Sequence, residues 1–180
     1  MSWTTKDYET FYPTDVMETG WDILFFWVAR MIMLGIYRTG KVPFKTIYLH
    51  GLVRDKDRQK MSKSKGNVID PLGISEIYGA DALRMALITS GAAGTDPVIS
   101  EEKIRGYRNF ATKLWNITRF ILMNYDVKLE EIQPKFSTED KRIEAELKKI
   151  KAKVTKEIDS YRFHEAASTA YQYIWHTFAD

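Results

Sequence analysis

The hydrophobic pattern of the first fifty residues predicts a strand, a helix and a second strand. Residues 12–20 have the composition of a short strand, with Pro13 confined to its beginning. Residues 22–37 are almost continuously apolar apart from Arg30, which is typical of a helix buried on most sides. Residues 46–53 are rich in β-branched and aromatic side chains and fit a buried parallel strand. This order predicts a βαβ unit, and therefore a doubly wound α/β sheet.

The pattern then changes to that of short helices and a connection. Asp70 and Pro71 suit the N-cap and the first position of a helix that Gly79 ends, and residues 80–90 form the next helix. Residues 91–97 read GAAGTDP, which is the small and flexible composition of a domain linker.

The remainder of the chain follows helical periodicity. Ser100 is placed to cap the first of these helices. Three helices are expected, over about 100–124, 138–158 and 162–178. We therefore predict an α/β fold followed by an all-α part, with an α/β domain over residues 1–98 and the beginning of a helical bundle over residues 99–180.

Composition narrows the class of protein only moderately. The 180 residues are 44% hydrophobic and 28% charged, and their formal net charge of +3 permits a nucleic-acid partner without requiring one. Cysteine is absent, which excludes disulfides and thiolate metal sites and favours the reducing cytoplasm. The longest apolar run, residues 23–36, is too short to span a membrane. The last helical pattern runs to Asp180 without a cap, so we expect a piece of a larger enzyme.

The most unusual segment is a cationic loop that follows the second predicted strand. Residues 58–71 read RQKMSKSKGNVIDP, and residues 54–65 carry six cationic side chains against two aspartates. A solvated charged surface is one interpretation. The other is a polyphosphate site, because open α/β sheets bind ligands at the carboxyl ends of their strands and mobile ammonium groups suit phosphates. The segment is neither a P-loop nor a calcium loop, since the glycines and the glutamate of those motifs are missing.

These residues carry a family resemblance. KMSKS (residues 60–64), continued as KGNVIDP, resembles the second signature of class I aminoacyl-tRNA synthetases. The upstream segment FYPTDVMETGWDILFFWVARM, residues 11–31, resembles the valyl members of that family. An isoleucyl member would show Gln and an Arg-Gly-Trp-Phe cluster where this chain has residues 23–27, but that alternative is kept, as is a non-catalytic tRNA-binding module. The resemblance implies the C-terminal half of a Rossmann-like doubly wound parallel sheet and part of a helical anticodon-binding bundle.

The resemblance assigns the cationic loop to ATP. It implies that Lys60 and Lys63 meet the negative charge that develops on pyrophosphate as it leaves, and that Met61, Ser62 and Ser64 shape the loop around the nucleotide. The implied substrates are valine, ATP with Mg²⁺ and tRNA(Val), and no protein ligand for the metal is identified. His164 and His176 have no nearby ligand set, so neither is assigned to a metal.

Other positions match the family's nucleotide and amino-acid sites. Gly20 and Asp22 match a Gly-x-Asp that approaches the adenosine ribose, although a strand end with an N-capping Asp is an equal alternative. His50 and Gly51 lie where the family holds adenine through backbone groups, and a satisfied core histidine is the alternative for His50. Trp27 matches a wall of the amino-acid pocket, while packing in the core is its alternative.

The first helix of the bundle carries cationic and aromatic residues together. Its four candidates for contact with tRNA phosphates are Arg105, Arg108, Lys113 and Arg119. For any one of them, a solvated face of a packing helix is the alternative.

The family's other signature, a His-x-Gly-His-like element, is absent from this sequence, as are the first strands of the sheet. We therefore expect the isolated chain to be inactive without a missing N-terminal half of the same enzyme.

Overall fold

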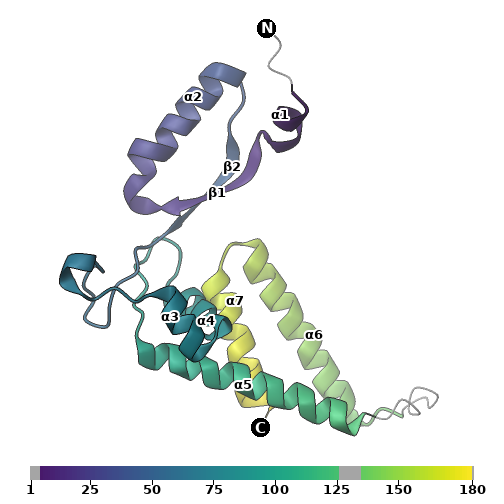
Figure 1. Cartoon of the computed structure of the whole chain (residues 1–180). Helices are drawn as coiled ribbons and strands as arrows, with labels where there is room; N and C mark the ends of the chain where they lie inside the picture. Colours follow the sequence, from purple (N-terminus) through teal and green to yellow (C-terminus); the bar gives the residue numbers. More distant parts are fainter. Residues whose placement is uncertain (1–4, 126–134, 180) are drawn as a thin grey trace. The chain divides into compact units, whose positions relative to one another are not determined.

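The computed structural model describes residues 5–125 and 135–179, which form two compact units. The first unit contains the described residues up to Leu52 together with Ala93–Pro97. The second contains Val53–Ala92 and the described residues from Val98 onward. Figure 1 shows strands together with helices in the first unit and helices in the second, so the predicted order of an α/β part followed by an all-α part is confirmed.

The first unit is a βαβ unit preceded by a short helix that the sequence did not predict. After α1 (Lys6–Phe11), the strands β1 (Thr14–Gly20) and β2 (Phe44–His50) pair in parallel, with α2 (Ala29–Thr39) between them in the chain (Figure 1). The pairing runs from Thr14 opposite Phe44 to Gly20 opposite His50. Both strands therefore end at one edge of the sheet.

The predicted burial of these elements is wrong for the described chain. The predicted helix begins as a 3₁₀ turn, η1 (Trp21–Ile23), and a π turn, η2 (Leu24–Val28), before α2 starts. Phe25 and Phe26 are 75% and 64% exposed, and α2 has no buried residue. The reason is that two strands and one crossover helix offer too few layers to enclose so much apolar surface.

The second unit begins with helices whose ends the sequence predicts well. Asp70 caps α3 (Pro71–Tyr78) by accepting hydrogen bonds from the N–H groups of Leu72 and Gly73, both at 3.1 Å. Gly79, with φ of +89°, separates it from α4 (Ala80–Ser90). The small side chains of Ala82 and Ala86 on α4 are buried with Ile99 and Ile104, which lets α4 and α5 pack closely.

The longer helices complete this unit. Ser100 caps α5 (Glu101–Asn124) through its hydroxyl, as predicted, and Ser137 with Asp140 forms a capping box at the start of α6 (Thr138–Asp159). The last elements are α7 (Phe163–Tyr173) and the π turn η5 (Ile174–Phe178).

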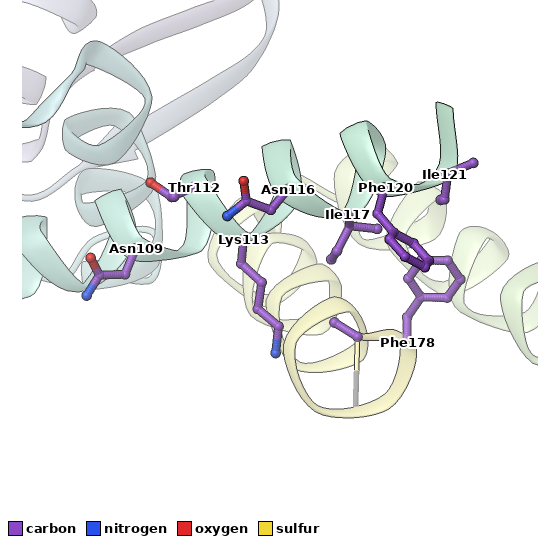
Figure 2. A pocket seen from close by; sticks show the side chains of 9 residues that line it. Asn109, Thr112, Lys113, Asn116, Ile117, Phe120, Ile121 and Phe178 are labelled. Carbon is purple, nitrogen blue, oxygen red and sulfur yellow. The ribbon is translucent and has the colours of Figure 1, made fainter. Parts of the chain in front are cut away.

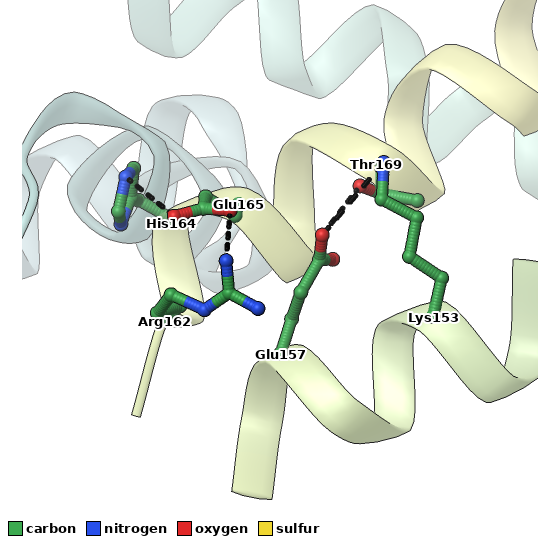
Figure 3. Close-up of polar contacts among 6 residues, drawn as sticks. All are labelled: Lys153, Glu157, Arg162, His164, Glu165 and Thr169. Carbon is green, nitrogen blue, oxygen red and sulfur yellow. Dashed lines mark hydrogen bonds and ion pairs between the residues drawn. The ribbon is translucent and has the colours of Figure 1, made fainter. Parts of the chain in front are cut away.

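A buried carboxylate lies between α6 and α7 (Figure 3). Glu157 is 3% exposed, and its Oε1 accepts a hydrogen bond from Thr169 at 3.4 Å and lies 3.7 Å from the ammonium of Lys153. At the corner between the helices, Arg162 forms an ion pair with Glu165 at 2.8 Å, and the ring of His164 lies 3.9 Å from the same carboxylate. Glu157 thus ties the two helices of this hairpin together.

The segment predicted to be a flexible linker is held in place by its backbone. The N–H of Gly94 donates to the carbonyl of Leu49 at 2.8 Å, and Ala93–Pro97 belongs to the first unit. The compact units therefore divide at Leu52 and around this segment. The predicted domain boundary near residue 98 stays a prediction.

Candidate functional site

The edge where both strands end brings four of the predicted site residues together. Gly20 is buried, and a Cβ added to it would lie 2.7 Å from Oδ1 of Asp22 and 3.6 Å from the ring of His50. A glycine at this position therefore allows Asp22 to fold back over the strand end. Gly51 follows His50 directly, so Gly20, Asp22, His50 and Gly51 line one edge of the first unit.

His50 is half-buried and is held by oxygens on both sides. Its Nδ1 lies 2.9 Å from the carbonyl oxygen of Gly51, and its Nε2 lies 3.3 Å from the carboxylate of Glu18. These contacts orient the ring at the end of β2, so contacts within the protein alone can account for a histidine at this position. The ring is thus partnered, but its side chain is 44% exposed and does not lie in a core, and the assignment of His50 to adenine stays a prediction.

Gly51 is required for close packing of the backbone. A Cβ on this residue would lie 1.9 Å from the carbonyl oxygen of Thr95 and 2.6 Å from the N–H nitrogen of Asp96. The segment Ala93–Pro97 therefore passes directly over the end of β2, and only glycine leaves room for it.

Trp27, the predicted wall of the amino-acid pocket, lies in the π turn η2. Its side chain is 55% exposed, so the core alternative is wrong within the described chain. A π turn inside a helix re-aims its side chains, and such turns are frequent at functional sites.

The cationic loop belongs to the second unit and starts as a tight hairpin. Arg54 and Lys60 pair across it as antiparallel partners, and Arg58 occupies the left-handed region with φ of +59°. After the hairpin, the end of the KMSKS segment forms the short 3₁₀ turn η3 (Lys63–Lys65). Gly66, with φ of +67°, ends this turn. The side chains of Lys60 and Lys63 are exposed, and neither forms an ion pair with a residue that the structure describes.

One asparagine that the sequence analysis did not single out holds this loop together. The Oδ1 of Asn67 accepts from the N–H of Ser62 at 2.9 Å. Its amide nitrogen donates to Asp55 at 2.7 Å and to the carbonyl of Lys60 at 3.3 Å. The amide group, which both donates and accepts, thus connects Asp55 of the hairpin to Lys60 and Ser62 in the first half of the lysine–serine run.

Asp55 is the anionic centre of the same loop. It accepts hydrogen bonds from Asn67 and from the N–H groups of Gln59 at 2.8 Å and Asp57 at 3.0 Å. The hydrogen bond from Asn67, followed by that from Gln59, holds the pKa of this carboxyl below its ordinary value. Asp55 therefore stays ionised and keeps the hairpin closed while the lysines next to it remain exposed.

We expect Asn67→Ala to loosen the loop without unfolding the unit. Three hydrogen bonds disappear, each contributing about 1 kcal/mol to local stability. Amide hydrogen exchange should therefore become roughly 10²-fold faster across residues 60–66. Asn109→Ala, which alters an exposed asparagine on α5, should leave exchange in the loop unchanged. Unaltered exchange in Asn67→Ala would contradict the bracing role.

A second candidate surface lies along α5. Exposed side chains recur at helical spacing and share one face of the helix. They are Arg105, Arg108, Asn109, Thr112, Asn116 and Arg119. From Lys103 to Asn124 the helix contains no acidic residue, so this face is cationic along its whole length.

A cavity of about 640 Å³ opens on this face, between α5 and η5 (Figure 2). Its polar lining includes the amides of Asn109 and Asn116, and its apolar lining includes Phe120 and Phe178. Lys113 is fixed beside it. The ammonium of Lys113 donates to the carbonyl of Trp175 at 3.0 Å and lies 4.5 Å from the centre of the Trp175 ring. Flat aromatic surfaces next to amide and ammonium groups suit an unpaired nucleotide.

No group of histidine, aspartate and glutamate within residues 5–125 and 135–179 is arranged to hold a metal ion. In the same described ranges, no helix has the length and apolar character needed to cross a membrane.

Comparison with known proteins agrees with this geometry. Residues 1–100 match the family model of class I tRNA synthetases (I, L, M and V), and residues 140–180 match the model of the anticodon-binding domain of tRNA ligases. A valine–tRNA ligase of Solibacter usitatus is 50% identical to this chain, in a match that covers 98% of it. A valine–tRNA ligase of Pelagibacter ubique is 51% identical, in a match that covers 97% of it. This chain spans 20% of the length of each of these relatives.

A solved structure shows the same fold. Methionyl-tRNA synthetase of Mycobacterium tuberculosis, in complex with methionyl-adenylate, superposes with a TM-score of 0.74 at 26% identity. The match covers 93% of this chain and 33% of that protein. Because one family model matches more than half of the residues, the chain belongs to the class I tRNA synthetases.

Proposed function

We propose that this chain is part of a valine–tRNA ligase, which activates valine with ATP and transfers it to tRNA(Val) in the cytoplasm. The observation that carries the proposal is the identity of about 50% to valine–tRNA ligases over nearly the whole chain. Activation joins the carboxylate of valine to the α-phosphate of ATP and releases pyrophosphate. The aminoacyl group then passes to the 3′ end of the tRNA.

The cationic loop would act on the leaving pyrophosphate. The exposed ammonium groups of Lys60 and Lys63 are not neutralised by any described carboxylate, so their charge is available to phosphate oxygens. The backbone and hydroxyls of Met61, Ser62 and Ser64 would shape the loop, and Ser62 and Ser64 already contact each other at 3.2 Å. Because Asn67 and Asp55 hold the backbone of the loop, the exposed side chains of Lys60 and Lys63 can follow the charge as the bond breaks.

The strand ends would hold the nucleoside and the amino acid. We assign the ribose to Gly20 and Asp22, adenine to the backbone around His50 and Gly51, and a wall of the valine pocket to Trp27. A carboxylate beside a buried glycine suits ribose hydroxyls. Mg²⁺ would enter bound to the phosphates of ATP.

The direct test is valine-dependent exchange of pyrophosphate into ATP. It needs a complete enzyme, so this chain would replace the matching residues of the Solibacter usitatus relative, and in a second chimera those of the Pelagibacter ubique relative. We expect exchange with valine in both chimeras and none with the isolated chain. Two folded chimeras without valine-dependent exchange would contradict the proposal, while exchange with isoleucine alone would favour the isoleucyl alternative.

We further propose that the cationic face of α5 binds tRNA, with phosphates on the arginines and an unpaired base in the cavity of Figure 2. A non-catalytic tRNA-binding module would use the same face. That second candidate predicts tRNA binding in a chimera that performs no exchange.

Replacing Arg105, Arg108 and Arg119 together by Gln should weaken binding of tRNA(Val) to the chain and flatten its salt dependence. Each lost phosphate contact lowers the slope of log Kd against log salt by about 0.7–0.9, so the total change is roughly 2–3. Fluorescence anisotropy at several salt concentrations measures it. A triple variant of exposed cations in the first unit, at Lys6, Arg30 and Lys41, serves as the control with an unchanged slope.

A further inference from the structure

The ends of β1 and β2 are joined by a residue that lies far from both in the sequence. Oδ1 of Asp96 accepts a hydrogen bond from the N–H of Leu52 at 2.8 Å and another from the indole Nε1–H of Trp21 at 3.4 Å. The two donors are 44 and 75 residues away along the chain. A single carboxylate oxygen therefore fixes the turn after β1 to the turn after β2.

Both donors are neighbours of the proposed nucleotide site. Trp21 lies between Gly20 and Asp22, and Leu52 follows His50 and Gly51. The two hydrogen bonds therefore restrain the backbone beside each of these neighbours.

The backbone around Asp96 is itself fixed. The N–H of Gly94 donates to Leu49 at 2.8 Å, and the carbonyl of Thr95 packs against Gly51 so closely that a Cβ there would lie at 1.9 Å. The segment that contains Asp96 is thus held against the end of β2 by a hydrogen bond and by close packing. Its carboxylate serves no other proposed step of the reaction.

We propose that Asp96 is a positioning residue for ATP: it sets the spacing between the ribose site after β1 and the adenine site after β2. This inference rests on the proposed function. It assigns to Asp96 no contact with the substrate, and it makes Trp21 and Leu52 the groups through which Asp96 acts. A residue that only stabilised the fold would lower the amount of active enzyme without changing the KM for ATP in particular.

The test uses exchange kinetics in the Solibacter chimera, with residues numbered as in this chain. Asp96→Ala should raise the KM for ATP about tenfold and leave the KM for valine within twofold. Asp96→Asn keeps an acceptor oxygen for Leu52 and should restore most of the loss. Trp21→Phe removes one donor and should raise the KM for ATP about threefold, with little further effect when it is combined with Asp96→Ala.

Asp15→Ala is the matched control. Asp15 lies at the opposite end of β1 and forms an exposed ion pair with Lys45 at 3.1 Å, so its loss should leave both KM values unchanged. The NMR signal of the Trp21 indole N–H, identified by its absence in Trp21→Phe, should move in Asp96→Ala of the isolated chain and stay in place in Asp15→Ala.

The possible failures separate cleanly. An unsubstituted chimera that is folded and shows no valine-dependent exchange overturns the proposed function, and this inference with it. An active chimera in which Asp96→Ala leaves the KM for ATP unchanged, or raises the KM for valine equally, overturns the positioning role alone. A selective rise in the KM for ATP that Asp96→Asn reverses supports it.

Discussion

Replacing Lys63 by Ala should lower the kcat of valine-dependent pyrophosphate exchange in the chimera by about 10²–10³-fold. Removing one preorganised donor from a developing negative charge costs roughly 3 kcal/mol of transition-state stabilisation. Lys63 begins the 3₁₀ turn η3, and its side chain is exposed, so its charge is free to meet phosphate oxygens. If, as proposed, the contact tightens as pyrophosphate leaves, the KM for ATP should change much less than kcat. Steady-state exchange kinetics over a range of ATP concentrations measure both.

Two further variants make the Lys63 result specific. Lys56→Ala removes a cation from the same hairpin, outside the KMSKS signature, and should change kcat by less than about threefold, because an exposed distant charge is screened by salt. Lys63→Arg keeps the charge but replaces a compact ammonium by a planar fork, so partial activity is expected. If Lys63→Ala retained kcat within threefold, the loop would have no role in stabilising the leaving group.

Local signals in the sequence were sufficient to predict most of the secondary structure. Asp70 before Pro71, Gly79 and Ser100 each act within one helical turn, and each begins or ends a helix in the structure as predicted. The change from strand-like to helical periodicity likewise predicted the parallel strands and the helices after them. These signals depend only on neighbours in the chain, which a sequence displays directly.

Burial could not be predicted in the same way. The apolar run of residues 22–37 has the composition of a core helix, yet Phe25 is 75% exposed and Leu34 is 67% exposed. The hydrophobicity of a segment indicates its tendency to be buried. Whether it is buried depends on how many packing layers the described chain supplies. The π turn η2 was also missed, because no composition rule separates it from an ordinary helical turn.

The residues that organise the candidate sites were the hardest to find. Asn67 holds Asp55 across 12 positions, and Asp96 reaches Trp21 across 75. Asn67 left a weak signal, since asparagine side chains in turns often hydrogen-bond to nearby backbone groups. Asp96 left none, because its neighbours Gly94, Thr95 and Pro97 have the composition of a mobile linker. Residues that shape a site through long-range hydrogen bonds were therefore not found from the sequence, whereas residues that belong to a local motif were.

Replacing Gly51 by Ala should disable the same edge through sterics rather than charge. The added Cβ would lie 1.9 Å from the carbonyl oxygen of Thr95, far inside van der Waals contact, and that oxygen belongs to the backbone. No side-chain rotation can relieve the overlap, so the segment Ala93–Pro97 must move away from β2. Overpacking of this kind costs about 1–3 kcal/mol. Because Asp96 moves with the segment, its hydrogen bond to Leu52 should be lost as well.

We therefore expect Gly51→Ala to lower the Tm of the chimera and to reduce kcat/KM for ATP at least tenfold. Calorimetry and exchange kinetics measure the two effects, and faster hydrogen exchange at the N–H of Leu52 locates them. Gly106→Ala is the matched control, because a Cβ at Gly106 on α5 meets nothing within 4 Å and alanine favours a helix. It should leave the kinetics unchanged and raise stability slightly. If Gly51→Ala kept both the Tm and the kinetics of the parent, the close passage of the segment over β2 would not exist in solution, and the positioning role of Asp96 would lose its structural basis.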